Sequence, residues 1–73
     1  MSADVQVWVN GERRRLASGT TLDRLVAELL AAPAGPGGIA AAVNETVIPR
    51  GQWPATALAE GDRVEVLTAV QGG

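Results

Sequence analysis

The last two residues, Gly72 and Gly73, are the feature of this chain with the clearest chemical meaning. A terminal carboxylate becomes an electrophile once it is activated, for instance by adenylation, and the activating enzyme must hold the tail extended in a narrow channel. Glycine has no Cβ atom, so it fits such a channel and lets a nucleophile reach the carbonyl carbon from either face. The alternatives are a chance pair, because glycine makes up 9 of the 73 residues, and a frayed end without function.

The composition limits what other chemistry the chain can perform. Its 73 residues suffice for one small domain, and a hydrophobic fraction of 47% favours a packed core over disorder. The chain has no cysteine and no histidine, so we expect no disulfide, no metal site and no catalytic side chain. All six basic residues are arginine, so activated copies of the chain cannot be joined through lysine. The protein is therefore expected not to be an enzyme.

Charge and hydropathy indicate where the protein works. The net charge of −2 argues against a nucleic-acid partner. No stretch is long and apolar enough to span a bilayer, and Met1-Ser2-Ala3-Asp4 lacks the basic and apolar regions of a secretory signal. We expect a cytoplasmic protein with no membrane partner that is a monomer when free.

The first third of the chain predicts a β-hairpin. Val5, Val7 and Val9 alternate with polar residues or tryptophan, which is the pattern of a half-buried strand. Asn10-Gly11 predicts a tight turn, because both positions tolerate positive φ. A second strand is expected over residues 12–17, with Leu16 in the core and the three arginines at 13–15 on a solvated edge.

A helix is predicted after this hairpin, with Thr20 or Thr21 as its N-cap. Apolar side chains recur at helical spacing and form one stripe: Leu22, Leu25, Val26, Leu29 and Leu30. We expect the helix to continue through Ala31-Ala32 and to end at Pro33. A flexible loop should follow up to residue 38.

The second half predicts three more strands, over residues 39–43, 46–48 and 63–68. Turns are expected at Asn44-Glu45 and at residues 60–62, and residues 50–58 should be irregular with one helical turn near Trp53-Pro54. The order of elements predicts an α+β fold, with a mixed sheet of about five strands and the helix across one face. The domain is expected over residues 1–68, and residues 69–73 should form a projecting flexible tail.

A family resemblance is carried by residues along most of the chain. In the first half they are the Asn10-Gly11 turn and the helix entry Gly19-Thr20-Thr21-Leu22. In the second half they are Ala42-Val43-Asn44-Glu45, Val47-Ile48-Pro49-Arg50, Trp53, Leu58, Gly61-Asp62-Arg63-Val64-Glu65 and Ala69-Val70 before Gly72-Gly73. With these residues in this order, the chain resembles the ThiS family of thiamine-biosynthesis sulfur carriers.

This resemblance implies a ubiquitin-like β-grasp fold and a function centred on Gly73. A ThiF-type enzyme would adenylate the Gly73 carboxylate with ATP, and a persulfide donor would convert it to a thiocarboxylate. Thiazole synthase would then take the sulfur. The tail that enters the partners' channels would be Ala69, Val70, Gln71, Gly72 and Gly73. No cofactor would be bound, since ATP is consumed by the activating partner.

Several assignments remain open at this stage. Arg50 and Trp53 are candidate partner contacts, although Trp53 could instead anchor the irregular segment on the core. Trp8 could belong to a docking patch or lie under the helix. Gln71 stands where the family often has glycine. Alternatives to the thiamine carrier are the small subunit of molybdopterin synthase, a ubiquitin-like protein modifier, and a plain binding module.

Overall fold

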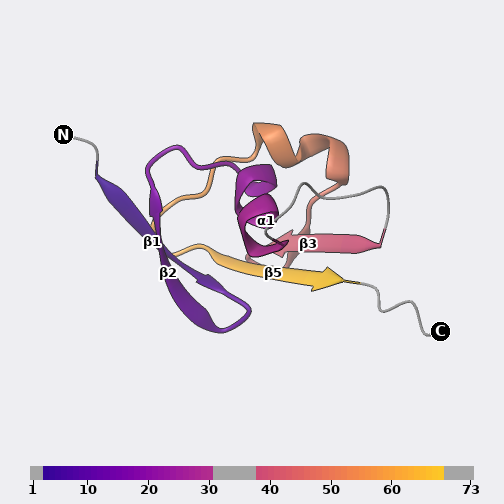
Figure 1. The fold of residues 1–73 in the computed structure, drawn as a ribbon, viewed down its shortest axis with the longest axis horizontal. Coiled ribbons are helices and arrows are strands. Elements are labelled where there is room, and N and C mark those ends of the chain that lie inside the picture. Colours follow the sequence, from indigo (N-terminus) through magenta and orange to yellow (C-terminus); the bar gives the residue numbers. More distant parts are fainter. Residues whose placement is uncertain (1–2, 31–37, 69–73) are drawn as a thin grey trace.

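The computed structural model describes residues 3–30 and 38–68, which form a mixed five-stranded sheet with one helix packed across it (Figure 1). The elements in chain order are β1 (Asp4–Val9), β2 (Glu12–Ala17), α1 (Leu22–Leu30), β3 (Ile39–Val43), β4 (Thr46–Val47), the 3-10 helix η1 (Arg50–Ala55) and β5 (Arg63–Thr68). The predicted α+β fold and element order are confirmed. The predicted extension of the helix to Pro33 and the tail over residues 69–73 lie outside the described residues.

The sheet places the last strand at its centre. The strand order is β2-β1-β5-β3-β4, in which β1 and β5 run parallel and the other neighbours run antiparallel. The three arginines of β2 therefore lie on an edge strand, as predicted. β4 is one residue shorter than expected: the Ile48 N–H still donates to the Ala41 carbonyl oxygen at 2.9 Å, but Pro49 has no N–H with which to continue the pairing.

Both tight turns use residues at positive φ. Asn10 (φ 52°) and Gly11 (φ 85°) connect the paired residues Val9 and Glu12, which is the predicted two-residue hairpin. Asn44 (φ 50°) and Glu45 (φ 72°) form the equivalent turn between β3 and β4. Glu45 thus occupies a left-handed conformation that glycine adopts more readily.

The core lies between α1 and one face of the sheet. The apolar stripe of the helix faces inward, with Leu22, Leu25 and Val26 fully buried and Leu29 and Leu30 packed against the core. The other buried hydrophobic residues are Val7, Val9, Leu16, Ala41, Trp53, Leu58, Val64 and Val66. Val5 is only half-buried, near the start of β1.

The segment after β4 returns to the start of α1 and covers the core at that end of the helix. The Leu22 N–H donates to the Thr56 carbonyl oxygen at 2.9 Å, and the Leu58 N–H donates to the Thr20 carbonyl oxygen at 2.9 Å. Thr21 precedes α1 as predicted, but its hydroxyl donates to the Asp23 carboxylate. The start of α1 is therefore held mainly by the backbone of a distant segment.

Candidate functional site: the base of the tail and the open sheet face

The residue predicted to carry the chemistry, Gly73, lies outside the described residues together with the rest of the tail, Ala69, Val70, Gln71 and Gly72. The structure describes the strand from which this segment continues. β5 lies between β1 and β3, and its Val64 and Val66 side chains are buried in the core. The five C-terminal residues thus follow the central strand of the sheet.

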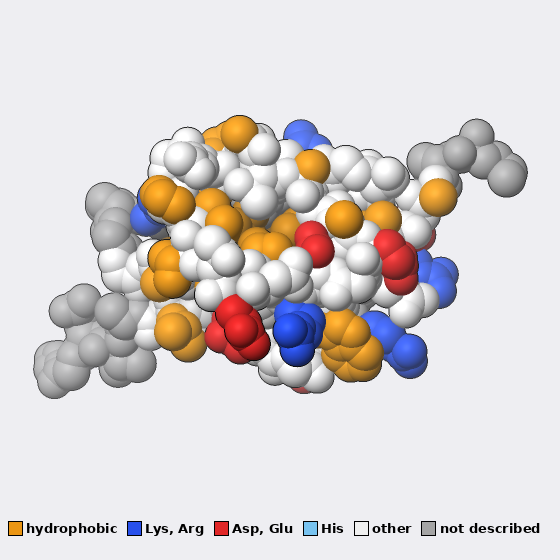
Figure 2. All heavy atoms as spheres, turned by 180° about the vertical axis from the view of Figure 1, so that it is seen from behind, with side chains coloured by type: hydrophobic (Ala, Val, Ile, Leu, Met, Phe, Trp, Pro, Cys, Tyr) orange, Lys and Arg blue, Asp and Glu red, His pale blue; other side chains and the backbone are white. Residues whose placement is uncertain are grey.

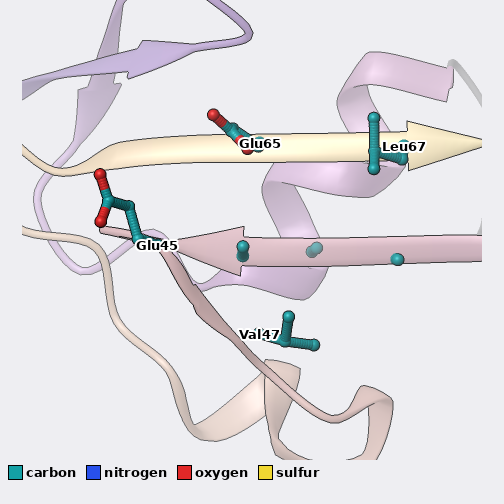
Figure 3. Close-up of a pocket in the computed structure, with 7 residues that line it drawn as sticks. Glu45, Val47, Glu65 and Leu67 are labelled. Atoms are coloured by element: carbon teal, nitrogen blue, oxygen red, sulfur yellow. The ribbon is translucent and has the colours of Figure 1, made fainter.

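The face of the sheet opposite α1, which we call the open face, carries the large exposed apolar side chains. They are Trp8 (44% exposed), Val47 (70%) and Leu67 (67%). Leu67 pairs with Ala40, and Val47 pairs with Ala42, so their side chains lie on one face of the sheet. Figure 3 shows Leu67 and Val47 on the near side of the sheet with α1 behind it.

A shallow hollow of about 300 Å³ lies between these side chains. Ala40 and Ala42 form its floor, because their short side chains leave space between the longer side chains of β4 and β5. Glu45 and Glu65 lie at its margin with exposed carboxylates (Figure 3). The hollow therefore offers an apolar surface beside two negative charges.

The other end of the open face is basic. Gln6, Arg13 and Arg15 line a second, polar hollow of about 260 Å³ on β1 and β2. The Arg13 guanidinium carbon lies 5.9 Å from the centre of the Trp8 ring, within the range of a cation–π contact. In the view from behind, hydrophobic side chains alternate with acidic and basic ones along the lower rim of the molecule (Figure 2). A protein that binds the open face would thus meet apolar contacts between charges of opposite sign.

Trp53 has the anchoring role that was one of its two predicted alternatives. Its side chain is only 2% exposed, and its indole N–H donates to the Ile48 carbonyl oxygen at 2.9 Å. The Arg50 guanidinium carbon lies 5.0 Å from the centre of the Trp53 ring. Of these two candidate contacts, the half-buried Arg50 is therefore the more accessible to a partner.

Sequence reasoning left Trp8 undecided and missed Val47 and Leu67. Trp8 is on the open face, since it pairs with Arg13 and lies on the same side of the sheet as Arg63. Leu67 has a signal in the sequence, because it is out of phase with the inward Val64 and Val66. Val47 has no such signal, since a strand of two residues has too few positions to show an alternation.

Residues 3–30 and 38–68 contain neither a cluster of metal ligands nor a membrane-spanning helix. No group of three or more acidic, histidine or cysteine side chains in this part of the chain is arranged to hold a metal ion. None of the described helices is long and apolar enough to cross a membrane.

Comparison with known proteins places this fold among sulfur carriers. The model of the ThiS family matches residues 7–73. The sulfur carrier protein ThiS of Escherichia coli is 29% identical over 69 residues, which are 94% of this chain and 100% of that protein. The crystal structure of the thiamine biosynthesis protein ThiS from Geobacter metallireducens superposes with a TM-score of 0.74 at 28% identity, covering 94% of this chain and 100% of that one.

A larger protein also contains a similar segment. A thiazole synthase of Magnetococcus marinus is 35% identical over 69 residues, which are 94% of this chain. The present chain spans only 20% of the length of that protein.

Proposed function

Because this chain belongs to the ThiS family, we propose that it is a sulfur carrier of thiamine biosynthesis whose sulfur is held on the carboxyl group of Gly73. The observation that carries the proposal is the family match, which extends to Gly73. Similarity along the full length of a named sulfur carrier supports it. In this proposal residues 1–68 form the domain, and residues 69–73 form the tail that enters the partners' active sites.

The chemistry requires activation by a partner. The Gly73 carboxylate attacks the α-phosphorus of ATP on a ThiF-type enzyme, which forms an acyl adenylate and releases pyrophosphate. The terminal sulfur of a cysteine persulfide then attacks the carbonyl carbon, and AMP leaves. A thiol cleaves the resulting acyl disulfide, so that the thiocarboxylate is released and the two other sulfur atoms are joined. The carrier contributes its end group and no acid–base side chain, in keeping with its lack of histidine and cysteine.

Thiazole synthase is the proposed acceptor of the sulfur. Support comes from the Magnetococcus marinus protein of that name, in which a segment similar to this chain occupies a fifth of the length. A carrier segment within such a protein would hold the sulfur donor close to the enzyme that uses it. The proposed location of this reaction is the cytoplasm, where ATP is available to the activating enzyme.

We further propose the open face as the surface on which these partners dock. Val47 and Leu67 expose most of their apolar side chains to solvent. Leu67 lies two residues before the tail begins. Contacts at Leu67 would therefore hold the base of the tail directly against the partner. Arg50 is a second candidate contact, on η1. Trp53 would act indirectly, by holding η1 and Arg50 in place.

The test is intact-mass analysis after incubation with a ThiF-type enzyme, ATP and a persulfide donor. The full-length chain should gain the mass that corresponds to one sulfur atom in place of one oxygen atom. A variant that lacks Gly73 is the matched control, and it should gain nothing while its melting temperature is unchanged. No gain in the full-length chain, with an enzyme that modifies a known carrier, would refute the assignment.

The molybdopterin and protein-modifier alternatives share this activation chemistry, but the comparisons favour the thiamine carrier. Transfer of the sulfur to the acceptor enzyme distinguishes the thiamine carrier from the molybdopterin alternative. Thiocarboxylated chain should support thiazole formation by thiazole synthase, and it should not support sulfur transfer by the large subunit of molybdopterin synthase.

A further inference from the structure

The β1–β2 turn does not end the contact between this hairpin and the central strand. β1 pairs with β5 only at Trp8–Arg63 and Val9–Val64, because the chain turns away at Asn10. On its other side β5 stays paired with β3 as far as Thr68. After Val64, the β1 backbone therefore offers no further strand pairing to β5, in the part of β5 that leads to the tail.

The side chain of Asn10 occupies this place. Its Oδ1 atom accepts a hydrogen bond from the Val66 N–H at 2.9 Å, and its Nδ2 atom donates to the Val66 carbonyl oxygen at 3.2 Å. The Asn10 N–H also donates to the Val64 carbonyl oxygen at 2.9 Å. One residue thus continues the ladder of β1 by one further step, because a carboxamide presents the same donor and acceptor as a peptide group.

We infer that Asn10 is a positioning residue for the reaction at Gly73, because its carboxamide fixes the end of β5 from which the reactive tail departs. The inference rests on the proposed function and adds to it a residue distant from the tail in sequence. A tail whose base is already ordered loses less conformational entropy when it enters a partner's channel. Asn10 takes no part in the chemical step itself.

Asn44 provides a matched control within the same chain. It has the same residue type, lies in the equivalent turn at φ 50° and also holds β5. Its Oδ1 accepts from the Arg63 N–H at 2.9 Å, and its own N–H donates to the Arg63 carbonyl oxygen at 2.7 Å. Arg63 is the first residue of β5, so Asn44 holds the end of the strand that is farther from the tail. Loss of either carboxamide should weaken the fold, but only Asn10 should affect the tail.

The experiment compares Asn10→Gly and Asn44→Gly with the wild-type chain, since glycine adopts both turn conformations and the backbone freedom that it adds is common to the two variants. Steady-state sulfur loading by a ThiF-type enzyme is measured well below the melting temperature of the least stable variant. For Asn10→Gly we expect kcat to fall about fivefold. The conformational freedom that one residue of β5 regains would shift the equilibrium for entry of the tail into the partner's channel by roughly this factor or more. KM should stay within about twofold in both variants, because the docking residues are unchanged.

Amide hydrogen exchange supplies a second measurement that does not depend on the enzyme. Exchange at Val66 and Leu67 should accelerate in Asn10→Gly and stay near the wild-type rate in Asn44→Gly. Equal kcat in the two variants, or unchanged exchange at Val66 in Asn10→Gly, would overturn the inference while leaving the carrier function intact. If the wild-type chain itself gains no sulfur, the proposed function fails, and this inference fails with it.

Discussion

Replacement of Leu67 by alanine tests the docking surface, because Leu67 exposes most of its side chain to solvent in the free carrier. Complete burial of a leucine side chain contributes about 1.5–3 kcal/mol relative to full exposure. Since 67% of Leu67 is exposed, its burial by a partner would contribute about two thirds of that amount, roughly 1–2 kcal/mol. Alanine would forfeit most of this contribution, and each 1.4 kcal/mol corresponds to about a tenfold change in affinity. We therefore expect KM for the carrier to rise by about fivefold to thirtyfold.

The assay is steady-state sulfur loading by a ThiF-type enzyme, monitored by intact mass at a series of carrier concentrations. The kcat value should change little, because the tail and Asn10 are intact. Leu29→Ala is the matched control, since the same substitution on the core-facing side of α1 removes partly buried packing and leaves the open face unaltered. It should lower the melting temperature more than Leu67→Ala does, with KM unchanged. If Leu67→Ala has the wild-type KM, or if Leu29→Ala raises KM equally, the open face is not the docking surface.

Two substitutions address the turns and the buried tryptophan. Trp53→Phe keeps an aromatic ring in the core but removes the indole N–H that donates to the Ile48 carbonyl oxygen, so denaturant unfolding should show a loss of about 1–3 kcal/mol. Its KM for the activating enzyme should stay unchanged, and a rise in KM of the fully folded variant would show that partner binding requires the indole, either directly or through the position of Arg50. Glu45→Gly removes a side chain held at φ 72°, and thermal unfolding should reveal a gain of about 1 kcal/mol. A lower stability in Glu45→Gly would mean that the exposed contact between Glu45 and Arg63 matters more than the backbone strain.

Local sequence patterns were sufficient to predict the elements of this fold. The alternation at Val5, Val7 and Val9 and the helical spacing from Leu22 to Leu30 each have one physical explanation, because only one face of each element can be buried. The Asn10-Gly11 turn follows from the backbone freedom of its two residues. These signals act over a few residues, which is why they can be read from the sequence without the tertiary structure.

The proposed docking surface and the proposed positioning residue depend on contacts that no local sequence pattern contains. The pairing of Val47 with Ala42, which puts it on the open face, is determined by the register of a hairpin that closes through Glu45. The two hydrogen bonds between the Asn10 side chain and the Val66 backbone span 56 positions of the sequence. In the sequence Asn10 indicates only a turn, because a turn is by itself sufficient to explain an asparagine before a glycine.

The position of β5 connects stability to the proposed chemistry. β5 is paired with β3 as far as Thr68, it is held on its other side by β1 and Asn10 as far as Val66, and its buried Val64 and Val66 tie it to the core, so the last described residue before the tail belongs to the central strand of the sheet. Five residues follow Thr68, and an extended residue spans at most about 3.3–3.6 Å, so Gly73 can reach no farther than about 18 Å beyond the strand. A partner that docks on Leu67 must therefore have its active site within that distance of its docking surface. Under the proposed function the same limit applies to an activating enzyme and to a thiazole synthase, so both partners would have to bind the open face and accept the tail over a similar distance.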